Sequence, residues 1–199
     1  MATYSDIRYD MTLSTSATGI GGMVLLATET ASSSDTISFT SGIDSTYKEY
    51  IFKFIGIHPE TNSVNFSVGF RDGGSAYDAT KTTTLFDAFH NEGDTNAGMT
   101  YETGLDIAQG TGFQRLDAGD NIGADNDQCL TGYLHLFNPA STTFVKHFIT
   151  RITHSGQSDY AADTFTAGYC NVTAAIDGVQ FKMSSDAIDA GVIKMYGVL

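Results

Sequence analysis

The side chains of this sequence that could carry out chemistry are its histidines and a group of aspartates. Histidine nitrogens and carboxylate oxygens can bind metal ions, and both groups can transfer protons. The glycine-rich segment at 117–127, DAGDNIGADND, holds four carboxylates. The candidates are His58, His90, His135, His147 and His154, together with Asp117, Asp120, Asp125 and Asp127.

The spacing of the histidines does not favour a metal or catalytic site. His147 and His154 lie seven residues apart on one expected strand, so their side chains should point to opposite faces of a sheet. The other three histidines lie on separate segments. We therefore expect histidines that are hydrogen-bonded at strand ends and at the rim of the fold.

The acidic segment has the composition of a turn more than of a metal site. Its order, D-x-x-D-x-x-x-x-D-x-D, lacks the register and the final glutamate of an EF-hand calcium loop. Clusters of Asp, Asn and Gly more often form turns by hydrogen bonding to their own backbone. We expect a surface loop, no metal and no cofactor, with calcium binding as the alternative.

Signatures of catalysis are missing from the sequence. It contains no G-x-S-x-G elbow, no H-E-x-x-H, no G-x-x-x-x-G-K loop and no paired C-x-x-C. Among 23 acidic residues, a carboxylate pair suited to glycoside hydrolysis would occur by chance. The sequence therefore predicts a protein that is not an enzyme, and a glycan depolymerase is a less favoured alternative.

The net charge of the chain limits the classes of molecule that it is expected to bind. The 199 residues include 10 Lys and Arg against 23 Asp and Glu, so the net charge is -13 and neither nucleic acid nor an anionic membrane is an expected partner. No apolar run is long enough to span a membrane, and the start, MATYSDIRYD, lacks the features of a signal peptide. We expect no membrane insertion, synthesis in the cytoplasm, and thiols at Cys129 and Cys170, with one disulfide between them as the alternative.

Period-two alternation of apolar and small polar residues predicts an all-β fold. Apolar residues occupy the even positions from 64 to 70, and Arg-Asp-Gly-Gly at 71–74 then supplies a hairpin turn. The expected architecture is an antiparallel β-sandwich, jelly-roll-like, with eight to ten strands and little or no helix. Residues 78–89 are the best helix candidate but are too rich in Thr. The expected strands are at 22–29, 36–40, 50–57, 64–70, 130–137 and 143–153, with 179–184 and 193–196 as a terminal pair.

Two expected strands, at 50–57 and 130–137, are apolar on both faces. In a sandwich one face meets the other sheet, so the second apolar face needs a further layer. An identical subunit could supply that layer, and a long loop folded over the sheet could equally do so. In the first strand Tyr50, Phe52 and Phe54 interleave with Ile51, Ile55 and Ile57, and in the second Leu130, Leu134 and Leu136 interleave with Tyr133 and Phe137.

Residues 1–21 differ from the single sandwich domain expected at 22–199. Ile7, Tyr9, Met11 and Leu13 alternate with polar residues as in a strand, and a small-residue linker follows at 14–19. Such an arm can add itself to the edge of a neighbouring sheet and anchor the domain. The alternative is that this strand pairs within its own domain.

Three tyrosines in expected loops are candidate receptor contacts. They are Tyr77, Tyr101 and Tyr160, each placed among Asn, Asp and Gly. A tyrosine ring can stack on an apolar face while its hydroxyl forms hydrogen bonds, as in contacts with glycans or proteins. The alternative is that each ring covers an edge of the core.

The segments SFTSGIDSTYKEYIFKFIGIHP (38–59), LHLFNPASTTFVKHF (134–148) and DGVQFKMSSDAIDAGVIKMYGV (177–198) resemble β-sandwich virion proteins of tailed bacteriophages of marine bacteria. The resemblance implies a non-enzymatic structural protein of the virion, as a tail fibre or spike or a head decoration. It also implies a homotrimer that contacts other virion proteins and the host surface. Only 21 residues precede the domain, which suits attachment by the arm and not by a long shaft. A glycan-binding receptor module is the alternative function.

Overall fold

The computed structural model describes residues 22–199, which form twelve strands in two antiparallel sheets, and it shows no helix in that range. The expected all-β sandwich is confirmed. The four arm residues Ile7, Tyr9, Met11 and Leu13 lie outside the described residues. Residues 22–199 include no helix that is long and apolar enough to cross a membrane.

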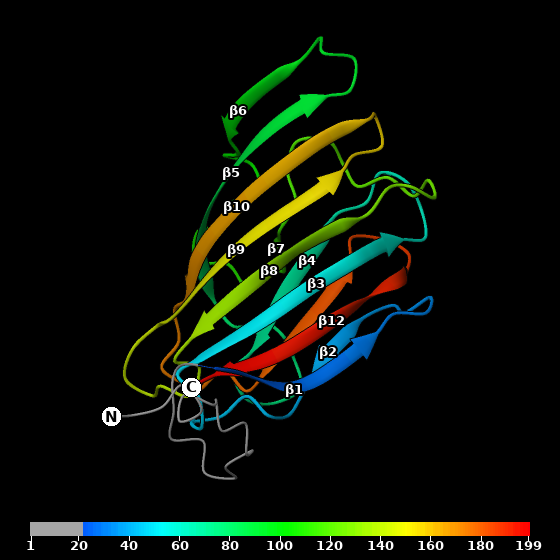
Figure 1. The fold of residues 1–199 in the computed structure, drawn as a ribbon. Coiled ribbons are helices and arrows are strands. Elements are labelled where there is room, and N and C mark those ends of the chain that lie inside the picture. Colours follow the sequence, from blue (N-terminus) through cyan, green and yellow to red (C-terminus); the bar gives the residue numbers. More distant parts are fainter. Residues whose placement is uncertain (1–21) are drawn as a thin grey trace, which may run out of the picture.

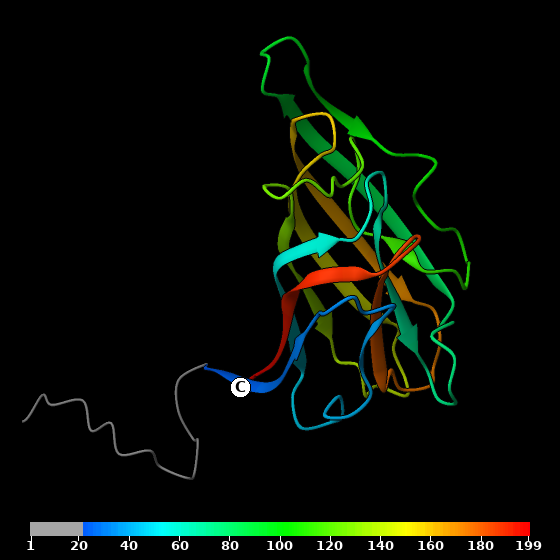
Figure 2. The ribbon, with the colours of Figure 1, turned by 90° about the vertical axis from the view of Figure 1, so that its right-hand side faces the viewer.

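The two sheets differ in size, and the smaller lies behind the larger in Figure 1. The large sheet has the order β1-β12-β3-β8-β9-β10-β5-β6, and the small sheet has the order β2-β11-β4-β7. Because the large sheet has twice as many strands, it extends past its partner, and β5 and β6 lie at its far end (Figures 1 and 2). The strands are β1 (Met23–Thr30), β2 (Ile37–Phe39), β3 (Glu49–Pro59), β4 (Phe66–Arg71), β5 (Lys81–Asn91), β6 (Ala97–Tyr101), β7 (Gln114–Arg115), β8 (Leu130–Phe137), β9 (Lys146–Ser155), β10 (Tyr160–Cys170), β11 (Gly178–Met183) and β12 (Ile188–Val198).

Aromatic rings from both sheets form the centre of the core. Phe181 on β11 is fully buried, and its ring centroid lies 5.1 Å from that of Phe54 and 5.6 Å from that of Phe52, both on β3. Phe70 on β4 meets Phe148 on β9 at 4.8 Å. These contacts hold the small sheet against β3 and β9 of the large one.

The structure corrects three details of the predicted fold. Residues 179–184 and 193–196 do not pair with each other, because β11 belongs to the small sheet and β12 to the large one. The segment at 91–127, expected to be irregular, contributes β6 and β7, so there are more than ten strands. Residues 78–89 lie largely in β5, as their threonines favour.

The alternation of β3 is interrupted by a bulge. Gly56 has a positive φ of 56°, and the pairing with β8 shifts between Phe54 and Ile57. One extra residue in a strand moves every later side chain to the other face. Ile57 therefore joins Phe54 in the core, and its predicted place beside Ile55 was wrong.

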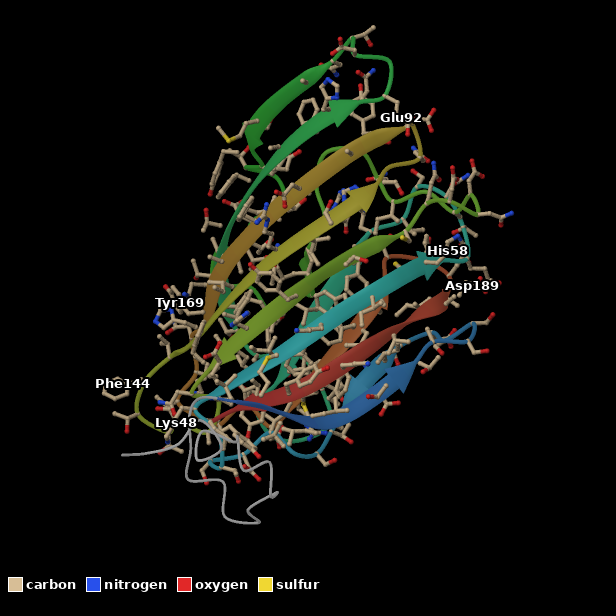
Figure 3. The ribbon with its side chains drawn as sticks, in the orientation of Figure 1. Lys48, His58, Glu92, Phe144, Tyr169 and Asp189 are labelled. Carbon is tan, nitrogen blue, oxygen red and sulfur yellow. The ribbon has the colours of Figure 1, made fainter. Side chains whose placement is uncertain are left out.

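Loops cover the outer face of the small sheet. The ring of Phe113 and the side chain of Tyr77 lie against Gly69 on β4, and a Cβ atom at that glycine would come within 2.6 Å of the Phe113 ring. The large sheet differs: among residues 22–199, no segment crosses its outer face, the face turned away from the small sheet and towards the viewer in Figures 1 and 3. The loop that could have covered the doubly apolar strands is not found in the described part of the chain.

Candidate interaction surface

Two rows of side chains cross the outer face of the large sheet from strand to strand. The pairing register places residues of neighbouring strands directly opposite one another, so that each row is continuous. The first row runs through Lys194, Lys53, Tyr133, Arg151, Phe165, Phe86 and Tyr101. The second runs through Leu25, Tyr196, Ile51, His135, Ile149, Ala167 and Thr84.

Stacked side chains order the first row. The rings of Phe86 and Phe165 are parallel, with centroids 5.0 Å apart, and the guanidinium of Arg151 lies 4.9 Å from the Phe165 ring. Arg151 also binds both carboxylate oxygens of Asp163, donating from Nε at 3.0 and 3.2 Å and from Nη2 at 2.7 Å. This arrangement holds a flat aromatic and cationic platform in place without a ligand.

Shallow hollows separate the large side chains of the outer face. Three adjoining ones, of about 300, 370 and 330 Å³, lie over β8, β9, β10 and β5. The small residues Ala167 and Thr84 form part of the floor of two of them, and Tyr133, Ile149 and Phe86 stand at their borders. The outer face thus alternates between protruding side chains and shallow hollows, and such a surface suits contact with an extended partner surface.

The structure separates the three predicted receptor tyrosines. Tyr101 ends the first row, and its hydroxyl donates to Asp106 at 2.8 Å. Tyr160 lies on the other face, since it packs against Phe89, and its hydroxyl accepts a bond from Asn96 at 2.9 Å. Tyr77 lies over the small sheet, 5.9 Å from the guanidinium of Arg71. Of the three, Tyr101 alone lies on the outer face of the large sheet.

The acidic segment does not form a common site. Asp117 is buried beside Arg115, with its Oδ2 3.1 Å from Nη2. Asp120 accepts from the backbone N–H of Ser158 at 2.6 Å and so binds the connection between β9 and β10. Residues 22–199 contain no group of three or more His, Cys, Asp or Glu side chains placed to hold a metal ion.

The histidines are dispersed over the fold. His147 is exposed on the outer face and His154 is buried on the inner one, so the expected opposite orientation is confirmed. His154 Nε2 lies 2.7 Å from the carbonyl oxygen of Asp120, and His135 contacts Glu49. Cys129 and Cys170, which lie at opposite ends of the large sheet, are free thiols, and burial raises the pKa of Cys170 to about 12.

Asp87 on β5 is a fully buried carboxylate, and neither of its oxygens has a hydrogen-bond partner among residues 22–199. Its Oδ2 would lie 2.7 Å from a Cβ atom placed on Gly119. Burial raises the pKa of Asp87 above its ordinary value of 3.8, and the nearby Glu102 carboxylate raises it further. The ionised form of this side chain is therefore disfavoured in the folded protein.

Replacing Asp87 with Asn should stabilise the protein at neutral pH. An acid whose pKa is raised by folding costs stability as the pH rises from its unfolded pKa through the folded one. At pH 7, the free energy of unfolding of Asp87→Asn should exceed that of wild type by about 1–3 kcal/mol. The difference should vanish near pH 4. Denaturant unfolding between these pH values measures this. A difference independent of pH would contradict the assignment.

Sequence reasoning missed Phe86, Phe165 and Arg151. On β10 the pattern is inverted, because Thr164 and Thr166 point into the protein while Phe165 points outward. The inward hydroxyl of Thr164 accepts a hydrogen bond from the backbone N–H of Ala118 at 3.0 Å. Asp163, Phe165, Ala167 and Tyr169 alternate with smaller or polar residues in YAADTFTAGYC (160–170), and this pattern could have revealed the face. Hydrophobicity alone assigns Phe165 to the core.

Searches against protein families, curated proteins and solved structures found no match to this chain. The fold and the surface therefore define its class by themselves. Residues 22–199 form an all-β sandwich with an unequal pair of sheets, and none of these residues covers the broad outer face of the larger sheet.

Proposed function

We propose that this protein is a non-enzymatic structural subunit on the surface of a bacteriophage virion, as a tail fibre or spike or a head decoration. The observation that supports this most is the outer face of the large sheet. It exposes large apolar side chains, including Ile149 on β9 and Phe86 on β5, which are 44% and 40% exposed and are separated by β10. Isolated soluble domains rarely expose so continuous an apolar surface, and subunits of assemblies do so regularly.

Other features support the same function. Residues 38–59, 134–148 and 177–198 resemble virion proteins of tailed phages. The strong negative charge suits a surface protein that does not bind nucleic acid. The stacked and ion-paired side chains of the first row are preorganised, as a standing contact surface requires.

The virion location has a direct test. Particles are purified by density gradient from cells infected with the phage that encodes this chain, and their proteins are identified and quantified by mass spectrometry. The protein should co-purify with the major capsid protein at a constant ratio through successive gradients. Its loss during purification, or its presence only in the unassembled fraction, would overturn the proposal.

The arm is the proposed attachment of the domain to the particle. Deleting residues 1–13, which removes Ile7, Tyr9, Met11 and Leu13, should leave the circular dichroism spectrum of the protein unchanged. The same deletion should reduce incorporation into particles by at least about tenfold, equivalent to ~1.4 kcal/mol of binding. A deleted chain that does not fold would show that these residues pair within their own domain.

A glycan-binding receptor module is the second candidate. The observation in its favour is the platform of Phe165, Phe86 and Tyr101 beside the Arg151 and Asp163 pair. Aromatic rings stack on sugar faces, and charged side chains bind hydroxyl groups. Binding of the full chain to an array of host-surface glycans, lost in Phe165→Ala, would favour this function, and an array without a hit would exclude it.

A further inference from the structure

We infer that the outer face of the large sheet is the surface through which a second copy of this chain binds. The inference rests on the proposed function and names the partner of its principal surface. Another virion protein and residues 1–21 are the other occupants to test. The extent, the charge and the internal order of the face favour a second copy.

The extent of the face matches what a stable interface needs. Eight strands spaced about 4.8 Å apart span ~34 Å, and four successive outward residues on each strand span ~20 Å, giving about 700 Å² per copy. Specific protein complexes bury about 800 Å² per partner. The large sheet thus supplies a standard interface without any contribution from loops.

Charge favours this face as the place where two copies meet. The chain carries -13, so two copies repel each other over most of their surface. The two rows contain the cations Lys194, Lys53 and Arg151 and no carboxylate. Three acids contact the rows from outside them: Glu49, Asp163 and Asp106 are engaged by His135, by Arg151 and by the Tyr101 hydroxyl. Within the two rows, a second strongly acidic chain therefore meets three cations and no carboxylate.

The first row is also polarised along its length. Lys194 and Lys53 lie on β12 and β3 at one side, and Phe165, Phe86 and Tyr101 lie on β10, β5 and β6 at the other. A rotation axis parallel to the strands, two-fold or three-fold, brings the lysine side of one copy over the aromatic side of the next. Lysine ammonium groups over aromatic rings are mutually attractive, so the face is complementary to itself.

The test compares variants of the full chain by light scattering over a concentration series. Wild type should have a mass that is at least twice the chain mass. Ile149→Asp and Phe86→Asp each place a carboxylate inside the contact. Each should raise the apparent dissociation constant at least about 100-fold, equivalent to ~2.7 kcal/mol. The circular dichroism spectrum and melting temperature of the monomer should remain those of a folded sandwich.

Phe144→Asp is the matched control. Phe144 is 69% exposed in the loop after β8, at the margin of the molecule in Figure 3 and away from both rows. Its replacement should leave the oligomer intact. A wild-type monomer at every concentration would overturn the inference, as would an oligomer unaffected by both face variants. Recovery of such a protein from purified particles would leave the virion function standing, so the two proposals fail separately.

Discussion

Phe181→Ala should lower the free energy of unfolding by about 3–5 kcal/mol, the largest effect expected of a single substitution in the core. Phe181 is fully buried, and it joins the two sheets at their centre. Its ring contacts Phe39, Phe52, Phe54 and Phe66, at centroid distances of 6.3, 5.6, 5.1 and 5.7 Å. Because these rings are held by two separate sheets, they cannot close in on the space left by the truncated side chain.

Urea unfolding followed by circular dichroism, at one protein concentration, measures this effect. Phe144→Ala removes the same atoms from a side chain that is 69% exposed, so it should change the unfolding free energy by less than about 0.5 kcal/mol. If Phe181→Ala does not fold, Phe181→Leu keeps most of the volume and should lose about 1–2 kcal/mol. Equal losses at positions 181 and 144 would mean that the sheets are not joined through this ring.

Asp117→Ala should lower the free energy of unfolding by about 3 kcal/mol, although Asp117 lies in a connection between strands. The carboxylate is fully buried and accepts the backbone N–H of Phe66 at 2.6 Å. It also lies 3.1 Å from Arg115 Nη2 and 3.3 Å from Asn65 Nδ2. Removing one partner of a buried ion pair leaves the other uncompensated, and here it also leaves a buried N–H without an acceptor.

Asp177→Ala is the comparison for this prediction. Asp177 pairs with Arg71 at 2.7 Å, but its side chain is 45% exposed, and pairs of this kind contribute about 0.2–1 kcal/mol. Asp117→Asn, which keeps an acceptor oxygen for the Phe66 N–H, should fall between the two alanine variants. Equal stability of Asp117→Ala and wild type would contradict the structural role of the pair.

The fold class could be predicted because alternation is a local property of the chain. Residues 64–70 alternate in the sequence, and most of them lie in β4 (Phe66–Arg71), with Phe66 and Phe70 in the core. The partners of each strand could not be predicted in this way. Residues 179–184 and 193–196 show the same alternation, yet they lie in different sheets because their partners are distant in sequence.

The candidate surface could be predicted in part. Two apolar faces on segments 50–57 and 130–137 indicated that the large sheet needs a further layer, and the outer face shows it uncovered in residues 22–199. The platform of Arg151, Phe165 and Phe86 on this face was not predicted. Phe165 lies between Thr164 and Thr166, which face inward, and Phe86 precedes Asp87, which also faces inward. Both strands reverse the usual relation between hydrophobicity and burial at these positions.

The sequence by itself determined that the chain is an acidic, all-β protein with period-two strands, since composition and alternation depend only on neighbours along the chain. The tertiary structure alone decided which strands pair, that the Gly56 bulge turns Ile57 into the core, and that Arg151 meets Phe165 and Asp163. These features depend on register between strands far apart in sequence, and a shift of one residue in register would move each side chain to the opposite face.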